Sequence, residues 1–113
     1  MKTIKKIVIA AMLITIANPS IAGEITRNVQ LVEVASHAFP GEKSFGVLTN
    51  ATSGLCAGVS QWIVFNEEKF ASLESYNQSF SLALTALTTG QNVRIHNYTD
   101  NSCDGADFIS ISR

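Results

Sequence analysis

The sequence predicts an all-β domain with one helix, in which five strands form a partly open barrel of the OB-fold type. One long segment, residues 67–89, has helical periodicity, whereas the other apolar runs after residue 22 are short and rich in β-branched or aromatic residues. Three such runs precede the helix and two follow it, giving the order β-β-β-α-β-β that the OB-fold has. A flat antiparallel sheet packed on one helix has the same order and is the alternative.

Residues 1–22 have the features of a signal peptide. Three lysines within residues 2–6 precede an apolar run at residues 7–16, and residues 20–22 (Ser-Ile-Ala) place small side chains before a cleavage site. The run is shorter than the roughly 20 residues that span a bilayer, which disfavours the alternative of a membrane anchor. We therefore expect a domain of residues 23–113 that is secreted or periplasmic and does not insert into a membrane.

Export changes the interpretation of the charges and of the cysteines. Loss of the leader lysines leaves five Lys and Arg against nine Asp and Glu, a net charge of −4. That acidity disfavours nucleic acid as a partner. In an oxidising compartment Cys56 and Cys103 are expected to form a disulfide, and two buried free thiols are the alternative.

Three strands are predicted before the helix. Residues 23–36 mix apolar and polar side chains in imperfect alternation, and Pro40-Gly41 then predicts a turn. Residues 44–49 predict a second, short strand. Residues 56–65 contain the Val, Trp, Ile and Phe side chains that are typical of a third.

The helix is predicted to begin after Asn66, a candidate N-cap, and to end at Gly90, a candidate C-cap. The last two strands follow at residues 92–98 and 107–112. Apolar side chains at helical spacing predict the helix face that packs on the core: Phe70, Leu73, Tyr76, Phe80, Ala83, Leu84 and Leu87.

The opposite face of this helix is unusual because residues 75–90 include no charged side chain. A solvated helix face in a small domain normally carries Lys and Glu. We expect the face to be covered, either by its own chain or by equivalent helices of a ring, and an exposed but neutral face is the alternative. Its residues are Ala71, Ser75, Ser79, Leu82 and Ala86.

Motifs for catalysis and metal binding are missing from the sequence. His37 and His96 are accompanied by no nucleophile elbow, and the adjacent Glu67 and Glu68 do not face each other on a helix. The last three aspartates lack the spacing of a calcium loop, and there is no phosphate loop. We expect no enzyme, no metal and no cofactor. A small secreted hydrolase, with His37 or His96 near a carboxylate, is a weaker hypothesis.

A carbohydrate-binding surface is the stronger prediction. Flat aromatic rings cover the apolar face of a pyranose, and amides and hydroxyls bond its hydroxyl groups. The residues expected to do so are His96, Asn97, Tyr98 and Trp62. For Trp62, burial in the core beside Ile63 and Phe65 is the alternative.

Two segments, Tyr76-Asn77-Gln78 and residues 88–95 (T-T-G-Q-N-V-R-I), resemble the B subunits of subtilase cytotoxin and of pertussis-like (typhoid) toxin. In that family a Trp precedes a helix with a Y-N-Q-like segment, the helix ends in T-G-Q, and a V-R-I strand follows. Trp62 and residues 88–95 keep this order. The similarity covers roughly residues 56–96. The family's sugar-contacting tyrosine falls at Asn97, with Tyr98 one place on.

The resemblance implies an OB-fold that assembles as a homopentamer, with helices lining the central pore and sialylated host glycans bound on the flank. It also implies a catalytic A subunit held by the ring. We therefore expect a secreted glycan-binding B subunit, or a B-subunit-like protein. The alternative is a stand-alone periplasmic or secreted OB-fold binding protein without toxin activity, which would be a monomer.

Overall fold

The structure is a computed structural model that describes residues 23–39 and 42–113. The predicted signal peptide, residues 1–22, lies outside the described residues. The described chain is mostly β-sheet with one long helix, as predicted. Its elements are β1 (Glu24–Val29), β2 (Leu31–Phe39), β3 (Glu42–Thr49), β4 (Ile63–Asn66), the short 3-10 helix η2 (Glu67–Lys69), α2 (Leu73–Thr89), β5 (Asn92–His96) and β6 (Phe108–Ser112).

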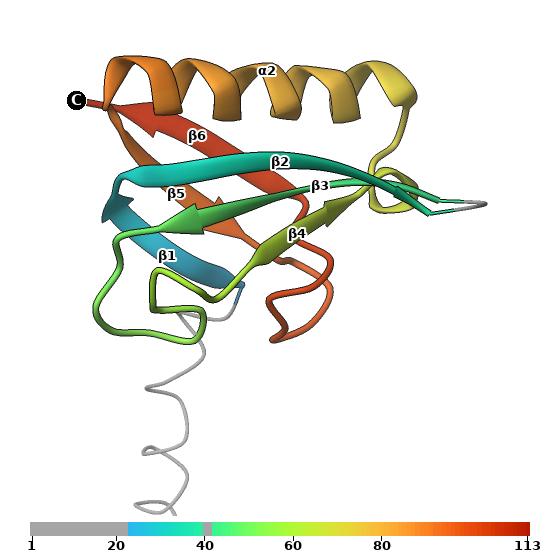
Figure 1. Cartoon of the computed structure of the whole chain (residues 1–113). Coiled ribbons are helices and arrows are strands. Elements are labelled where there is room, and N and C mark those ends of the chain that lie inside the picture. The colour runs from blue at the N-terminus through green and yellow to red at the C-terminus, as the bar shows by residue number, and fades with distance from the viewer. Residues whose placement is uncertain (1–22, 40–41) are drawn as a thin grey trace, which may run out of the picture.

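The strands form two antiparallel three-stranded sheets, in the orders β1-β5-β6 and β2-β3-β4 (Figure 1). The single flat sheet that was the alternative is therefore wrong. Helix α2 lies along one side of the molecule, where it contacts β2 of one sheet and β6 of the other. The helix thus covers apolar surface contributed by both sheets.

The predicted first strand, residues 23–36, is divided into β1 and β2 at Gln30. The Gln30 main chain bonds to Asn50 instead of to a neighbouring strand: its carbonyl accepts from the Asn50 amide at 3.0 Å, and its amide donates to Asn50 Oδ1 at 2.8 Å. The Gln30 side chain also donates to the Gly90 carbonyl at 2.6 Å. These bonds fix the point at which the chain passes from one sheet to the other.

The predicted third strand is wrong for residues 56–62, which belong to a loop. Only Ile63–Asn66 forms β4. The Gly58 amide bonds back to the Ala51 carbonyl at 2.9 Å, and the Gln61 amide bonds to the Gly58 carbonyl at 3.1 Å. Gly58 has a φ of 111°, which favours glycine, so the loop turns where an extended strand cannot continue.

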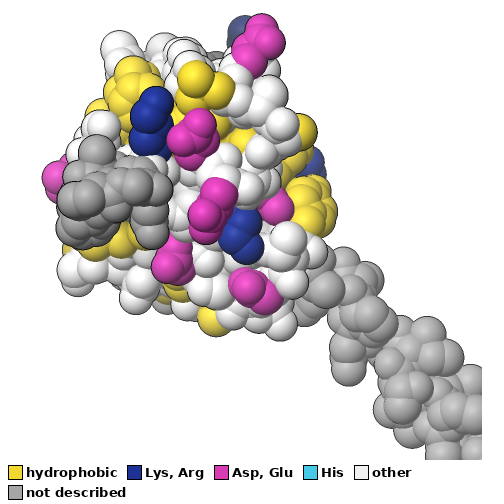
Figure 2. Space-filling view, turned by 90° about the vertical axis from the view of Figure 1, so that its right-hand side faces the viewer, with side chains coloured by type: hydrophobic (Ala, Val, Ile, Leu, Met, Phe, Trp, Pro, Cys, Tyr) yellow, Lys and Arg dark blue, Asp and Glu magenta, His cyan; other side chains and the backbone are white. Residues whose placement is uncertain are grey.

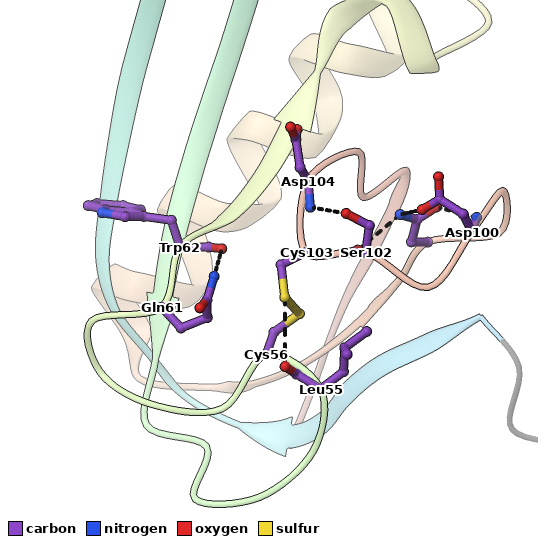
Figure 3. Close-up of a disulfide and its surroundings, with 9 residues drawn as sticks. Leu55, Cys56, Gln61, Trp62, Asp100, Ser102, Cys103 and Asp104 are labelled. Carbon is purple, nitrogen blue, oxygen red and sulfur yellow. Dashed lines mark hydrogen bonds between the residues drawn. A yellow bond between two sulfur atoms is a disulfide. The ribbon is translucent and has the colours of Figure 1, made fainter.

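The two sheets meet where β4 approaches the segment before β6. Val64 makes a parallel bridge with Asp104, and its carbonyl accepts from the amides of Gly105 and Ala106. The predicted disulfide between Cys56 and Cys103 is confirmed and lies at the same place (Figure 3). The loop before β4 and the loop before β6 are therefore joined both covalently and by main-chain hydrogen bonds.

Helix α2 begins at Leu73 rather than after Asn66. Residues 67–69 form the separate element η2, and Phe70 then adopts an extended conformation. The Ser72 side chain caps α2 by accepting from the Ser75 amide, and the predicted C-cap at Gly90 is confirmed, with a φ of 72°. Ser72, not Asn66, is therefore the N-cap of α2. The Asn66 side chain donates to Asp104 at 2.9 Å.

Aromatic and β-branched side chains fill the space between the sheets and α2. Phe45 on β3 stacks on Phe65 of β4 with ring centres 4.5 Å apart and contacts Phe80 of the helix at 5.1 Å. Val93 and Ile95 of β5 are fully buried in the same cluster. The core therefore contains side chains from both sheets and from the helix.

The face that carries the start of α2 and the β2–β3 hairpin is acidic. Figure 2 shows Asp and Glu side chains predominating over Lys and Arg there, and Glu67 and Glu68 occupy the first turn of η2. A surface of this charge repels polyanions. Among the helices of the described residues, none has the length and apolar character needed to cross a membrane.

Removal of the disulfide is expected to destabilise the domain by about 4 kcal/mol, because it closes a loop whose ends are 47 residues apart. The double variant Cys56→Ala/Cys103→Ala should show this loss in urea unfolding. Reduced wild-type protein should match the variant. An unchanged unfolding midpoint would show that the β4 hydrogen bonds alone hold this junction.

Candidate functional site

The outer face of the sheet β1-β5-β6 carries a polar and aromatic surface. Side chains alternate along β5, so that Val93 and Ile95 are buried while Arg94 and His96 lie on the other face. Phe108 on β6 pairs directly with His96 in the strand register. This pairing brings an aromatic ring and an imidazole together across the two strands.

Three rings form a cluster, here called the Tyr98 cluster: His96, Tyr98 and Phe108. The His96 and Tyr98 rings stack with centres 5.0 Å apart and an angle of 19°, whereas Phe108 meets His96 edge-on at 5.1 Å. The Arg94 guanidinium lies 5.5 Å from the Phe108 ring centre. Tyr98 is 61% exposed, so its outer surface is free to contact a ligand.

A groove of about 360 Å³ runs between the Tyr98 cluster and the start of α2. Its apolar walls include Tyr98 and Phe108, and polar groups reach it from Ser75, Gln78 and Asp107. Apolar walls with a few polar groups are typical of small-molecule sites. The arrangement can hold a flat, hydroxylated ring against Tyr98.

The surroundings of the His96 imidazole favour its uncharged form. Its side chain is 13% exposed, and both ring nitrogens lack a hydrogen-bond partner among the described residues. Burial lowers the pKa of His96 below its ordinary value of 6.5, Arg94 and Arg27 lower it further, and Glu24 opposes these effects. Glu24 Oε2 lies 3.8 Å from His96 Nε2 and 2.7 Å from Arg27 Nε.

Asn97, predicted as a ligand contact, is instead buried inside the loop that follows β5, with 1% of its surface exposed. Its side-chain oxygen, Oδ1, accepts hydrogen bonds from the Thr99 amide and hydroxyl and from the Asp100 amide. Its amide nitrogen donates to Asp100 Oδ1 and to the Ser102 carbonyl, both at 3.0 Å. The side chain holds the loop and has no donor or acceptor to offer a ligand in this conformation.

Trp62, also predicted in the site, lies elsewhere and is 37% exposed. Its ring covers Gly46 of β3, where an added Cβ would lie 2.9 Å from Trp62 Cε3. Figure 3 shows Trp62 pointing away from the loop that holds Asp100. The structure thus brings His96 and Tyr98 together and leaves Trp62 apart from them.

The predicted outward face of α2 also needs correction. Ala71 precedes the helix, and Ser79 and Ala86 are buried against the sheets. Ser75 is half-buried and Leu82 is 38% exposed. The core-facing residues of α2 are Tyr76, Ser79, Ala83 and Ala86.

Three leucines of α2 that were predicted to lie in the core are exposed. We call Leu73, Leu84 and Leu87, which are 36–46% exposed, the leucine face. Leu82, predicted on the opposite face, lies about 160° around the helix from Leu84 and lines the Tyr98 groove. Threonine hydroxyls nearby are satisfied within the helix, since Thr85, Thr88 and Thr89 donate to carbonyls four residues earlier. The exposed side of α2 therefore remains uncharged from residue 75 onward, although the residues differ from those expected.

Sequence reasoning missed Phe108, Arg94 and the groove residues Ser75 and Gln78 as parts of one site. The sequence placed Phe108 in a strand but did not show which residue lies opposite it. The register between β5 and β6 pairs it with His96. The alternation of residues 92–98 does predict that Arg94, His96 and Tyr98 share a face.

Replacement of Asn97 by Ala should destabilise the domain by about 1–3 kcal/mol, because several buried groups lose their partner. Urea unfolding measures the loss, and hydrogen exchange should become faster at the Thr99 and Asp100 amides. Asn101→Ala, at an exposed position of the same loop, is the matched control. Equal stability of the two variants would contradict the structural role of Asn97.

The described part of the chain contains no group of three or more His, Cys, Asp or Glu side chains arranged to hold a metal ion.

Comparison with curated proteins gave no match, and neither did comparison with solved structures. A family profile does match residues 5–113, nearly the whole chain. The chain therefore belongs to the family described as "Family of unknown function (DUF5992)".

Proposed function

We propose that this chain is an exported, non-catalytic carbohydrate-binding protein whose sugar site is the groove beside Tyr98. The observation that carries the proposal is the exposed Tyr98 ring beside a groove with hydroxyl, amide and carboxylate groups from Ser75, Gln78 and Asp107. A pyranose has an apolar face for the ring and hydroxyl groups for the polar side chains. The disulfide supports export, because it needs an oxidising compartment.

The fold we infer is a partly open OB-type barrel. The support comes from the strand pairing, in which β1 and β2 act as two halves of one bent strand, one in each sheet. The bridge between Val64 and Asp104 joins the sheets on the other side, and α2 lies between β4 and β5 in the sequence. This is the five-strand order with one helix that the OB-fold has.

The larger assembly in the proposal is a homopentameric toxin B subunit that carries a catalytic A subunit and binds sialylated host glycans. The toxin B-subunit resemblance of the sequence supports it, and so does the leucine face of α2. A chain with a net charge of −4 after export associates with copies of itself most readily through a surface that carries no charge. The alternative is a stand-alone secreted or periplasmic binding domain.

The sugar site is tested by a glycan array with the purified exported chain. Wild-type protein should bind at least one glycan, and Tyr98→Ala should weaken binding at least tenfold, equivalent to about 1.4 kcal/mol. Tyr98→Phe is the matched control, because it keeps the ring and should keep most of the affinity. A folded wild-type protein that binds no glycan would overturn the carbohydrate proposal.

The assembly is tested by light scattering during gel filtration. Wild-type protein should elute with the mass of an oligomer at micromolar concentration, and Leu84→Glu should shift it toward the monomer because a charge in the buried contact is unfavourable. Thr52→Glu, at an exposed loop position away from α2, should leave the mass unchanged. A monomeric wild-type protein would favour the stand-alone binding domain.

A further inference from the structure

His96 occupies the centre of the Tyr98 cluster, stacked beneath Tyr98 and in edge contact with Phe108. A neutral imidazole has one donor and one acceptor, and here both ring nitrogens are buried without a partner among the described residues. A phenyl ring would fill the same space without two unpaired polar atoms. The position therefore holds a titratable group whose neutral form is poorly satisfied.

The charged groups around His96 come from every element packed against it. On β1, Glu24 favours the charged imidazole and Arg27 opposes it; on β5, Arg94 opposes it; and Asp107, just before β6, favours it. Cleavage after Ala22 would add the α-amino group of Gly23, which titrates mainly above pH 7. The Glu24 carboxylate forms an ion-pair contact with the ring, with Oε2 at 3.8 Å from Nε2.

Protonation changes what the His96 ring requires. The imidazolium has two donors, and the 3.8 Å separation from Glu24 is about 1 Å too long for a hydrogen bond. A hydrogen bond between them requires the ring, the Glu24 carboxylate or both to move, and it competes with the 2.7 Å contact that Arg27 makes with the same oxygen. A ring that turned toward Glu24 would no longer support the inner face of Tyr98.

We propose that His96 is a pH-sensitive positioning residue: at mildly acidic pH its imidazolium turns toward Glu24, the stack with Tyr98 opens, and the Tyr98 groove loses affinity for its ligand. The effect on ligand rests on the proposed carbohydrate site, whereas the movement of Tyr98 does not. The change lies below pH 6.5, since burial and two arginines disfavour the charged ring.

The movement is tested without ligand by NMR titration of the exported chain from pH 7.0 to 4.5. The NOE between the His96 and Tyr98 rings should weaken with the same midpoint as the shift of the His96 Cε1–H resonance, below 6.5, because a chemical-shift change alone would also accompany protonation of a ring that stays stacked. An NOE that keeps its intensity through the His96 titration would overturn the movement. In Glu24→Gln both midpoints should move lower, because the group that attracts the imidazolium is gone. In His96→Phe, which keeps a ring in the stack, the Tyr98 resonances should stay constant. Tyr98 resonances that do not follow His96, or that still titrate in His96→Phe, would overturn the proposal.

The effect on binding is measured with the glycan that gives the strongest array signal at pH 7.0. Wild-type affinity should fall at least threefold between pH 7.0 and pH 5.0. The affinity of His96→Phe, whatever its value at pH 7.0, should change less than twofold over the same range. Equal wild-type affinity at both pH values would overturn the regulatory role. If the array shows no binding at all, the carbohydrate site fails while the NMR titration still decides whether His96 moves Tyr98.

Discussion

The junction between β4 and the segment before β6 is the constraint on which the rest of the structure depends. Val64 bonds through its amide and its carbonyl to residues 103–106, and the Cys56–Cys103 disulfide closes the same place. The pairing of β5 with β6 anchors both ends of the loop between these strands. The junction ties the second half of that loop to β4 of the other sheet, so that the loop that begins with Asn97 and Tyr98 is held by both sheets.

Much of the fold could be predicted from the sequence because local signals agree there with the tertiary structure. The disulfide followed from export and two cysteines, and the end of α2 from Gly90, which adopts the left-handed conformation expected of a C-cap. The start of α2 could not be predicted, because Asn66 and Ser72 are both good N-caps by residue type, and the contact of Asn66 with Asp104 is not visible in the local sequence. The division of the first strand depends equally on a distant partner of Gln30.

The orientation of α2 shows why hydrophobic periodicity alone can mislead. Leucine predicts a core position more strongly than alanine or serine does, yet α2 buries Ser79, Ala83 and Ala86 and exposes Leu84. Small side chains allow the helix to approach the strands closely, and the core volume is supplied by Phe45 and Phe65 from the facing strands and by Phe80 of the helix itself. The leucines on the exposed side of α2 are then free to contact another molecule.

The site residues illustrate a further limit of sequence reasoning. Asn97 and Tyr98 are neighbours with side chains typical of sugar binding, but in the loop after β5 the first is buried as the support of that loop and the second is exposed. His96 shares the outer side with Tyr98, and its two nitrogens, which have no partner among residues 23–39 and 42–113, are a destabilising feature that a phenylalanine at the same position would avoid. A domain of this size has only a few kcal/mol of stability to lose. The imidazole beneath Tyr98 is the group on which the proposed response of that ring to pH depends.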